Sequence, residues 1–165
     1  MGLGSATIGT VKTEAKSLMV WVMMTANRVY PPYFFDGRVT GKQVKAVLKR
    51  RLLRQKNPNG RFIFQQDNAS VHTSNVVRQY LHQNNVRCLT WPAQSPDLSP
   101  IENLFGLVKG RLRSVINPPR NIPELKKYLT KQFLSVPKTT LAKMVASMPN
   151  RCALVKKSAG FGIRY

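Results

Sequence analysis

Apolar residues gather in short runs along the chain, and polar or turn-forming residues separate the runs. A continuous apolar run over 17–24 is typical of a strand buried on both faces. A second strand is predicted over 29–35. Pro31 and Pro32 place it at a sheet edge, because proline cannot donate a ladder hydrogen bond. Residues 1–16 are small and polar with little periodicity, so a poorly structured lead-in is predicted there.

Helix and strand patterns alternate in the next part of the chain. Thr40 and Gln43 form a capping-box pair, which starts a helix that the apolar pattern extends to about Gln55. Three elements follow: a strand over 61–66, a helix over 74–84 and a strand over 86–91. This alternation indicates crossover connections and a locally parallel sheet.

Helical patterns fill the rest of the chain. Ser99 can cap a helix that begins at Pro100, and Glu102 then falls at its third position. Two more helices are predicted over 122–134 and 139–148. The predicted organisation is a lead-in over 1–16, an α/β core over 17–115, and a helical part over 116–165 packed on that core.

The charge balance points to a polyanionic partner. The 165 residues include 27 Lys and Arg against 6 Asp and Glu, a net charge of +21. Self-repulsion of this size costs stability unless a polyanion relieves it, so nucleic acid is the first partner to consider. Solvated helix faces, or a ribosomal or chromatin-like role, fit the charge equally well. The candidates for nucleic-acid contact are Lys45, Lys49, Arg50, Arg54, Lys109 and Arg113.

Neither a membrane span nor a metal-binding cysteine pattern is predicted. The apolar runs fall far short of the roughly 18 residues that a spanning helix needs. Cys88 and Cys152 lack CxxC spacing, so buried, reduced thiols of an intracellular protein are expected. A zinc site that adds His72 and His82 is the weaker alternative.

Two acids stand where phosphoryl-transfer chemistry could use them. Asp67 ends the predicted strand over 61–66, and open α/β sheets place their sites at such ends. Glu102 opens a helix after the next strand. Two carboxylates so placed can share Mg²⁺, and two such ions about 4 Å apart can clamp an in-line displacement. A simple turn at Asp67-Asn68 and a capping role for Glu102 explain the same residues without a metal.

The motifs around these acids resemble the catalytic core of Tc/mariner superfamily transposases. They are Gln65–Ala69, His72–Ser74, Trp91–Pro100 and Ile101–Leu104, with the strand around Trp21 before them and the tail Met148–Cys152 after them. The resemblance covers roughly residues 17–165. It implies an RNase H-like fold, a triad of two aspartates and a glutamate, and two Mg²⁺ (or Mn²⁺) ions that serve DNA cleavage and strand transfer. It also implies DNA as a partner, a homodimer and a nuclear location.

The resemblance assigns roles to particular residues and leaves one role empty. Asp67 matches the family's second aspartate and Glu102 its glutamate, both as metal ligands, while Asn68, His72 and Asp97 are expected to shape the site. The family's first aspartate lies on the central strand, ahead of the Trp21 strand. Glu14 and Asp36, the acids upstream of Asp67, do not match it.

The central strand is therefore predicted to be missing. Residues 5–12 could fill its slot poorly, another chain could supply it, or two apolar strand edges stay unpaired. The function expected is that of a cut-and-paste transposase catalytic domain impaired in cleavage, as in a decayed or mis-spliced transposon fragment. The alternatives are a non-enzymatic basic DNA-binding remnant and a structural ribonucleoprotein-type protein.

Overall fold

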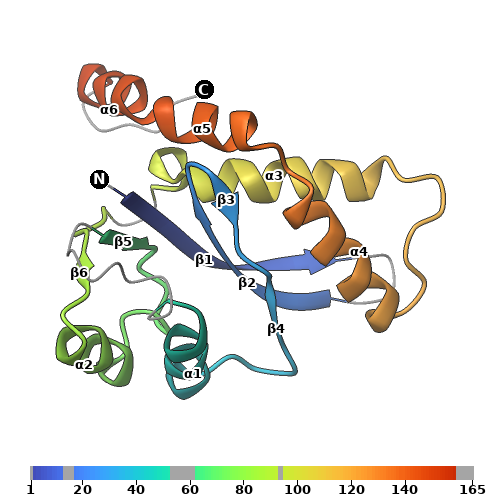
Figure 1. Cartoon of the computed structure of the whole chain (residues 1–165), viewed down its shortest axis with the longest axis horizontal. Helices are drawn as coiled ribbons and strands as arrows, with labels where there is room; N and C mark the ends of the chain where they lie inside the picture. Colours follow the sequence, from blue (N-terminus) through green and yellow to red (C-terminus); the bar gives the residue numbers. More distant parts are fainter. Residues whose placement is uncertain (1, 13–16, 53–61, 93–94, 159–165) are drawn as a thin grey trace.

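A mixed sheet lies between two layers of helices (Figure 1). The computed structural model describes residues 2–12, 17–52, 62–92 and 95–158. The strands are β1 (Gly2–Lys12), β2 (Ser17–Thr25), β3 (Arg28–Val29), β4 (Tyr33–Phe35), β5 (Phe62–Gln66) and β6 (Arg87–Cys88). Their order is β3-β2-β1-β5-β6, and β4 also pairs with β2. The helices are α1 (Gly41–Arg51), α2 (Asn75–Gln83), the short 3₁₀ turn η2 (Pro96–Leu98), α3 (Pro100–Arg113), α4 (Ile122–Leu134), α5 (Lys138–Ala146) and α6 (Met148–Lys157).

The central slot of the sheet is filled by β1. This strand pairs antiparallel with β2, from Ser5 opposite Met24 to Lys12 opposite Ser17. On its other side it runs parallel to β5, from Gly2 opposite Phe62 onward. The predictions of a poorly structured lead-in and of a missing central strand are therefore wrong for residues 2–12.

Small residues are what allow β1 to occupy this slot. A Cβ atom at Gly4 would lie 2.3 Å from the ring of Phe62, and one at Gly9 would lie 2.5 Å from the ring of Phe105. Large side chains of neighbouring elements thus cover the strand, which needs few large apolar residues of its own.

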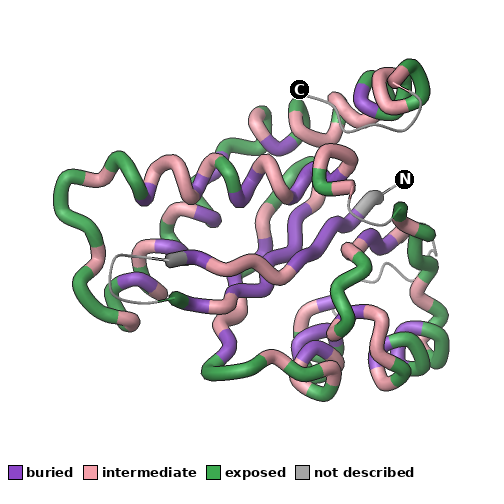
Figure 2. Tube along the Cα trace, turned by 180° about the vertical axis from the view of Figure 1, so that it is seen from behind, coloured by how far each residue is buried: buried purple, intermediate pink, exposed green. Residues whose placement is uncertain are grey.

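The apolar run in β2 is buried on both faces, as predicted. Alternate residues of a strand point to opposite faces of the sheet. Leu18, Val20, Val22 and Met24 belong to the core beneath α3, α4 and α5, whereas Trp21 and Met23 belong to the core beneath α1 and α2. Figure 2 shows the resulting buried band through the middle of the sheet.

Most other predicted elements are present, with shifted ends. The capping box of α1 is confirmed: the Gln43 N–H donates to Thr40 Oγ1 at 3.4 Å, and Gln43 Oε1 accepts from the Thr40 N–H at 2.9 Å. α1 ends at Arg51, and Gln55 lies outside the described residues. The predicted strand over 29–35 is split into β3 and β4 around Pro31 and Pro32, since prolines interrupt the ladder.

The parallel arrangement after α1 is confirmed, because β5 runs parallel to both β1 and β6. The strand predicted over 86–91 is reduced to the two residues of β6. The tail that follows α5 forms a further helix, α6, for which the sequence pattern gave no prediction. Within the described ranges, no helix has the length and apolar character needed to cross a membrane.

Candidate active site

The carboxyl end of β5 brings together side chains from three segments. Asp67 follows directly after β5. Thr7, in the central strand β1, donates a hydrogen bond from Oγ1 to Asp67 Oδ2 at 2.8 Å. His72, in the turn before α2, places Nδ1 2.5 Å from Asp67 Oδ1. Thr7 and His72 are both buried, so the partners of Asp67 are fixed by the packing around them.

These contacts hold Asp67 in its charged form. Burial by itself would raise the pKa of this carboxyl group. The hydrogen bond and charge of His72, the hydroxyl of Thr7 and the Ala69 N–H outweigh burial and lower the pKa below its ordinary value of 3.8.

Glu102 lies in the first turn of α3 and is partly buried. It interacts electrostatically with the negative charge of Asp67. Burial raises the pKa of Glu102, the negative charge of Asp67 raises it further, and Lys109 two turns along α3 opposes both. The two acids that the sequence singled out therefore belong to one electrostatic site. Two neighbouring carboxyl groups whose pKa values shift in opposite directions are an arrangement that often marks function.

The capping interpretation of Glu102 is not supported. Ser99 stands at the N-cap of α3, but its hydroxyl makes no hydrogen bond to the helix. Instead Ser99 Oγ accepts from Gln65 Nε2 at 3.2 Å, which ties the start of α3 to β5. One partner of the predicted capping box is thus engaged elsewhere, so helix capping does not account for Glu102.

Thr7 brings a side chain of the central strand into contact with Asp67. Alternate residues of a strand share a face, so Thr7 lies on the same face as Gly9, and Gly9 sits against Phe105 of α3. Its hydroxyl therefore lies beside Asp67, on the α3 side of the sheet where Glu102 is found. No sequence signal singles out this residue, because threonine is neutral and common in strands.

The residues present do not fit a centre of two metal ions. Such a centre holds both ions between shared carboxylates. Over the described residues there is no group of three His, Cys, Asp or Glu side chains that could hold a metal. Asp36 instead pairs with Lys126 of α4 at 3.0 Å, and Glu14 is outside the described ranges. Thr7 contributes a neutral hydroxyl where a carboxylate would be needed.

The other two predicted site-shaping residues fix the surrounding loops. Asn68 donates from Nδ2 to the carbonyl oxygen of Trp91 at 2.7 Å, which joins the end of β5 to the segment after β6. Asp97 lies in η2, where its Oδ1 accepts from the Leu98 N–H at 3.1 Å. Its carbonyl oxygen accepts from Nη1 of Arg151 at 3.0 Å, a buried arginine for which the sequence analysis predicted no role.

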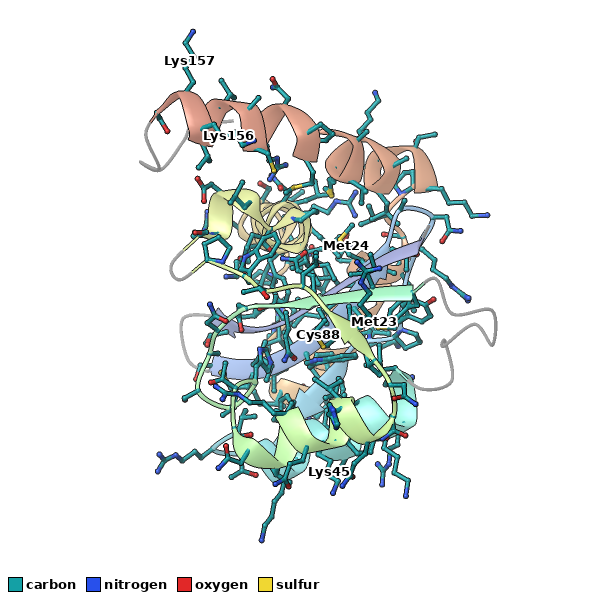
Figure 3. The ribbon with its side chains drawn as sticks, turned by 90° about the vertical axis from the view of Figure 1, so that its left-hand side faces the viewer. Met23, Met24, Lys45, Cys88, Lys156 and Lys157 are labelled. Atoms are coloured by element: carbon teal, nitrogen blue, oxygen red, sulfur yellow. The ribbon has the colours of Figure 1, made fainter. Side chains whose placement is uncertain are left out.

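The predicted nucleic-acid contacts lie on both sides of the sheet. α1 carries Lys45, Lys49 and Arg50, while α3, across the sheet, carries Lys109 and Arg113; Arg54 is outside the described residues. Figure 3 shows Lys45 at one end of the molecule and Lys156 and Lys157 at the opposite end. Positive charge therefore surrounds the protein and is not confined to one patch.

The predicted burial of the cysteines is wrong. Cys88 and Cys152 are free thiols, and both are exposed. Cys88 lies in the edge strand β6, and Cys152 lies in α6 next to the buried Arg151.

The chain is similar to known transposases and to one family of endonucleases. A profile of the family described as DDE superfamily endonuclease matches residues 4–126. The Tc3 transposase of Caenorhabditis elegans is 31% identical over 151 residues, which cover 90% of this chain and 46% of that protein. The Tc1 transposase of the same organism is 32% identical over 158 residues, which cover 94% of this chain and 57% of that protein. The chain spans about half the length of these relatives.

Solved structures share the architecture. The catalytic domain of Mos1 transposase, determined with Raltegravir and Mn, superposes with a TM-score of 0.84 at 21% identity, covering 98% of this chain and 84% of that chain. A Mos1 paired-end complex with the left transposon end gives 0.85 at 21% identity, covering 98% of this chain and 56% of that chain. At this identity the likeness establishes the fold, which is RNase H-like.

Proposed function

Since the chain belongs to the DDE superfamily endonuclease family, we propose that it is a DNA-binding transposase catalytic domain whose cleavage and strand-transfer activity is impaired. The observation that carries this proposal is the Thr7 hydroxyl, 2.8 Å from Asp67 Oδ2, where a carboxylate on the central strand would complete the site. The likeness to the catalytic domains of cut-and-paste transposases supports the substrate class.

The electrostatics explain why a hydroxyl at position 7 impairs the site. Replacing a carboxylate by threonine removes one negative charge from a site that must hold divalent cations. The remaining carboxylate of Asp67 is already hydrogen-bonded by Thr7 and His72. Asp67 and Glu102 are the residues we propose as ligands for Mg²⁺ or Mn²⁺. With these two acids alone, we expect weak binding of one ion at most.

DNA binding rests on different residues and should survive this change. The net charge is +21, and the described lysines and arginines include residues of α1 on one side of the sheet and of α3 on the other. Each phosphate that the protein neutralises contributes about 0.9 to the slope of log affinity against log salt. We therefore expect steeply salt-dependent, sequence-tolerant binding to duplex DNA. A flat response to salt would contradict the proposed partner.

The test is a nicking assay on supercoiled plasmid with Mn²⁺. The unmodified protein is expected to bind the plasmid without nicking it, whereas Thr7→Asp should bind Mn²⁺ and nick. Adding Asp67→Asn to Thr7→Asp should abolish both effects. Thr10→Asp is the matched control, because it puts the same charge on the opposite face of the same strand.

Two outcomes would change the conclusion. Nicking by the unmodified protein that Asp67→Asn abolishes would show that the site is not impaired. A folded, DNA-binding Thr7→Asp protein that neither binds Mn²⁺ nor nicks would remove the site assignment. The non-enzymatic DNA-binding remnant, which the widespread positive charge favours, would then describe the protein better.

The proposed action on DNA also leads to proposals for the location and the assembly of the protein. Action on chromosomal DNA requires a nuclear location, which imaging of a fluorescent fusion would test. Mos1 has been solved in paired-end complexes. We propose a homodimer on DNA for this chain as well, to be checked by light scattering of the purified complex.

A further inference from the structure

The C-terminal helix α6 is attached to the protein by an unusual anchor. A surface helix ordinarily docks through a stripe of apolar residues. Of the ten residues of α6, only Arg151 is buried, with 3% of its surface exposed. The helix also lies beyond residues 4–126, the part of the chain that the family profile matches. Met148, Leu154 and Val155 are only partly buried, so the most buried side chain of the helix is a charged group.

The Arg151 guanidinium donates hydrogen bonds to its own helix end and to the segment that starts α3. Nη1 donates to the carbonyl oxygen of Asp97 at 3.0 Å, and Nη2 donates to Asn103 Oδ1 at 2.7 Å. Nε donates to Ser147 Oγ at 2.9 Å, which orients the side chain from within its own helix end. The planar guanidinium group therefore contacts the chain on both sides of Glu102, at Asp97 and at Asn103.

Core packing holds the apolar side of this segment, since Ile101 and Leu104 are fully buried, but no side chain caps the start of the helix. The first four N–H groups of a helix lack intrahelical partners, and the first turn frays unless something holds it. Ser99 does not cap α3 with its side chain, since its hydroxyl bonds to Gln65. The polar contacts of the helix start therefore come from two directions, from Gln65 of β5 and from Arg151 of α6.

We propose that Arg151 is a positioning residue: it fixes the first turn of α3 and thereby the position of Glu102. Helix α6 would then contribute to the geometry of the candidate active site. The inference rests on the proposed function only where it gives Glu102 a role. A chain with so much positive charge has no electrostatic reason to bury another cation, and a buried guanidinium must be fully hydrogen-bonded to be tolerated. Lysine could not replace it, because an ammonium group lacks the rigid fork that spans two acceptors.

The first experiment measures amide hydrogen exchange by NMR in the unmodified protein, Arg151→Met, Arg151→Lys and Lys156→Met. Lys156 is exposed in the same helix, so its change to methionine is the matched control. Loss of a buried charge-assisted hydrogen bond should speed local opening by about tenfold or more. We expect this acceleration at amides 102–105 in both Arg151 variants, with amides 109–112 of the same helix changed less than about twofold.

Two results of this experiment would overturn the proposal. Equal acceleration along all of α3 would mean that Arg151 serves only global stability. No acceleration at 102–105 would mean that the grip on the helix start is unimportant. Arg151→Lys keeps the charge and most of the side-chain volume, so it supplies the answer if Arg151→Met does not fold.

The second experiment asks whether Glu102 is positioned for a metal. Calorimetry would measure Mn²⁺ affinity in Thr7→Asp alone and with Arg151→Lys or Lys156→Met added. We expect at least about a tenfold loss with Arg151→Lys and none with Lys156→Met. Unchanged affinity with Arg151→Lys would overturn the positioning role. If Thr7→Asp itself does not bind Mn²⁺, the proposed function fails, while the exchange measurement still decides the role of Arg151.

Discussion

Replacing Gly9 by alanine should destabilise the protein, because β1 and α3 leave no room for a methyl group. A Cβ atom at position 9 would lie 2.5 Å from Cε1 and 2.9 Å from Cδ1 of Phe105. Favourable carbon contacts need about 3.5–4.0 Å. Phe105 cannot easily retreat, since it is fully buried and its ring packs edge-to-face against Phe133 with centroids 5.3 Å apart.

The size of the effect follows from two opposing terms. Overpacking of a dense core costs about 1–3 kcal/mol. Exchanging glycine for alanine also restricts the unfolded chain, which stabilises the folded protein by about 0.4–1 kcal/mol. The net expectation is a loss of about 1–2 kcal/mol, which lowers the Tm of a protein of this length by about 2–8 °C.

Urea denaturation followed by circular dichroism would measure this loss. Gly106→Ala is the control, because no atom lies within 4 Å of a Cβ at that helical position, so it should stabilise by up to about 1 kcal/mol. Phe105→Leu should make room for the new methyl group, so Gly9→Ala should cost less in that background than alone. A Gly9→Ala protein as stable as the original would refute the placement of β1 beneath α3.

Three further predictions concern single groups. Asp67 has a lowered pKa, so its stabilising contribution is complete above its ordinary pKa of 3.8 and is lost as the pH falls further. Asp67→Asn should therefore be less stable than the original at neutral pH, and urea titrations should show the difference closing below about pH 4. Glu102 behaves in the opposite way. Its raised pKa means that its charge opposes folding above the ordinary value of 4.5, so Glu102→Gln should stabilise at neutral pH and lose that advantage in acid; equal stability at neutral pH would contradict the burial of this carboxylate. Asn121 caps α4 by accepting from the Glu124 N–H at 2.9 Å, so thermal melts of Asn121→Ala should show a loss of about 1 kcal/mol, and no loss would show that the cap is dispensable.

Features whose causes are local could be predicted from the sequence. The capping box at Thr40 needs only its own four residues, and the run over 17–24 shows by itself that both faces of β2 are buried. Asp67 and Glu102 could be singled out because an acid is conspicuous in so basic a chain, and the structure brings them into one electrostatic site.

Features that depend on partners far away in the sequence could not be predicted from it. β1 looks like a loose polar segment because Phe62 and Phe105, far along the chain, supply the bulk that covers it. Ser99 could either cap α3 or bond to Gln65, and only the packing decides between them. Arg151 reads as one of many cations until its contacts with Asp97 and Asn103 are seen.

The position of β1 between β2 and β5 also sets the order in which the protein can be assembled during synthesis. Its antiparallel partner β2 follows within a few residues, but its parallel partner β5 begins only at Phe62, about 37 residues after β2 ends at Thr25. At about 5–20 residues per second, a ribosome needs roughly 2–7 s to make that stretch. During this interval the β1–β2 hairpin carries an open edge that other nascent chains can pair with. Conditions that slow translation between β2 and β5 should therefore lower the yield of folded protein without altering a single contact in its final structure.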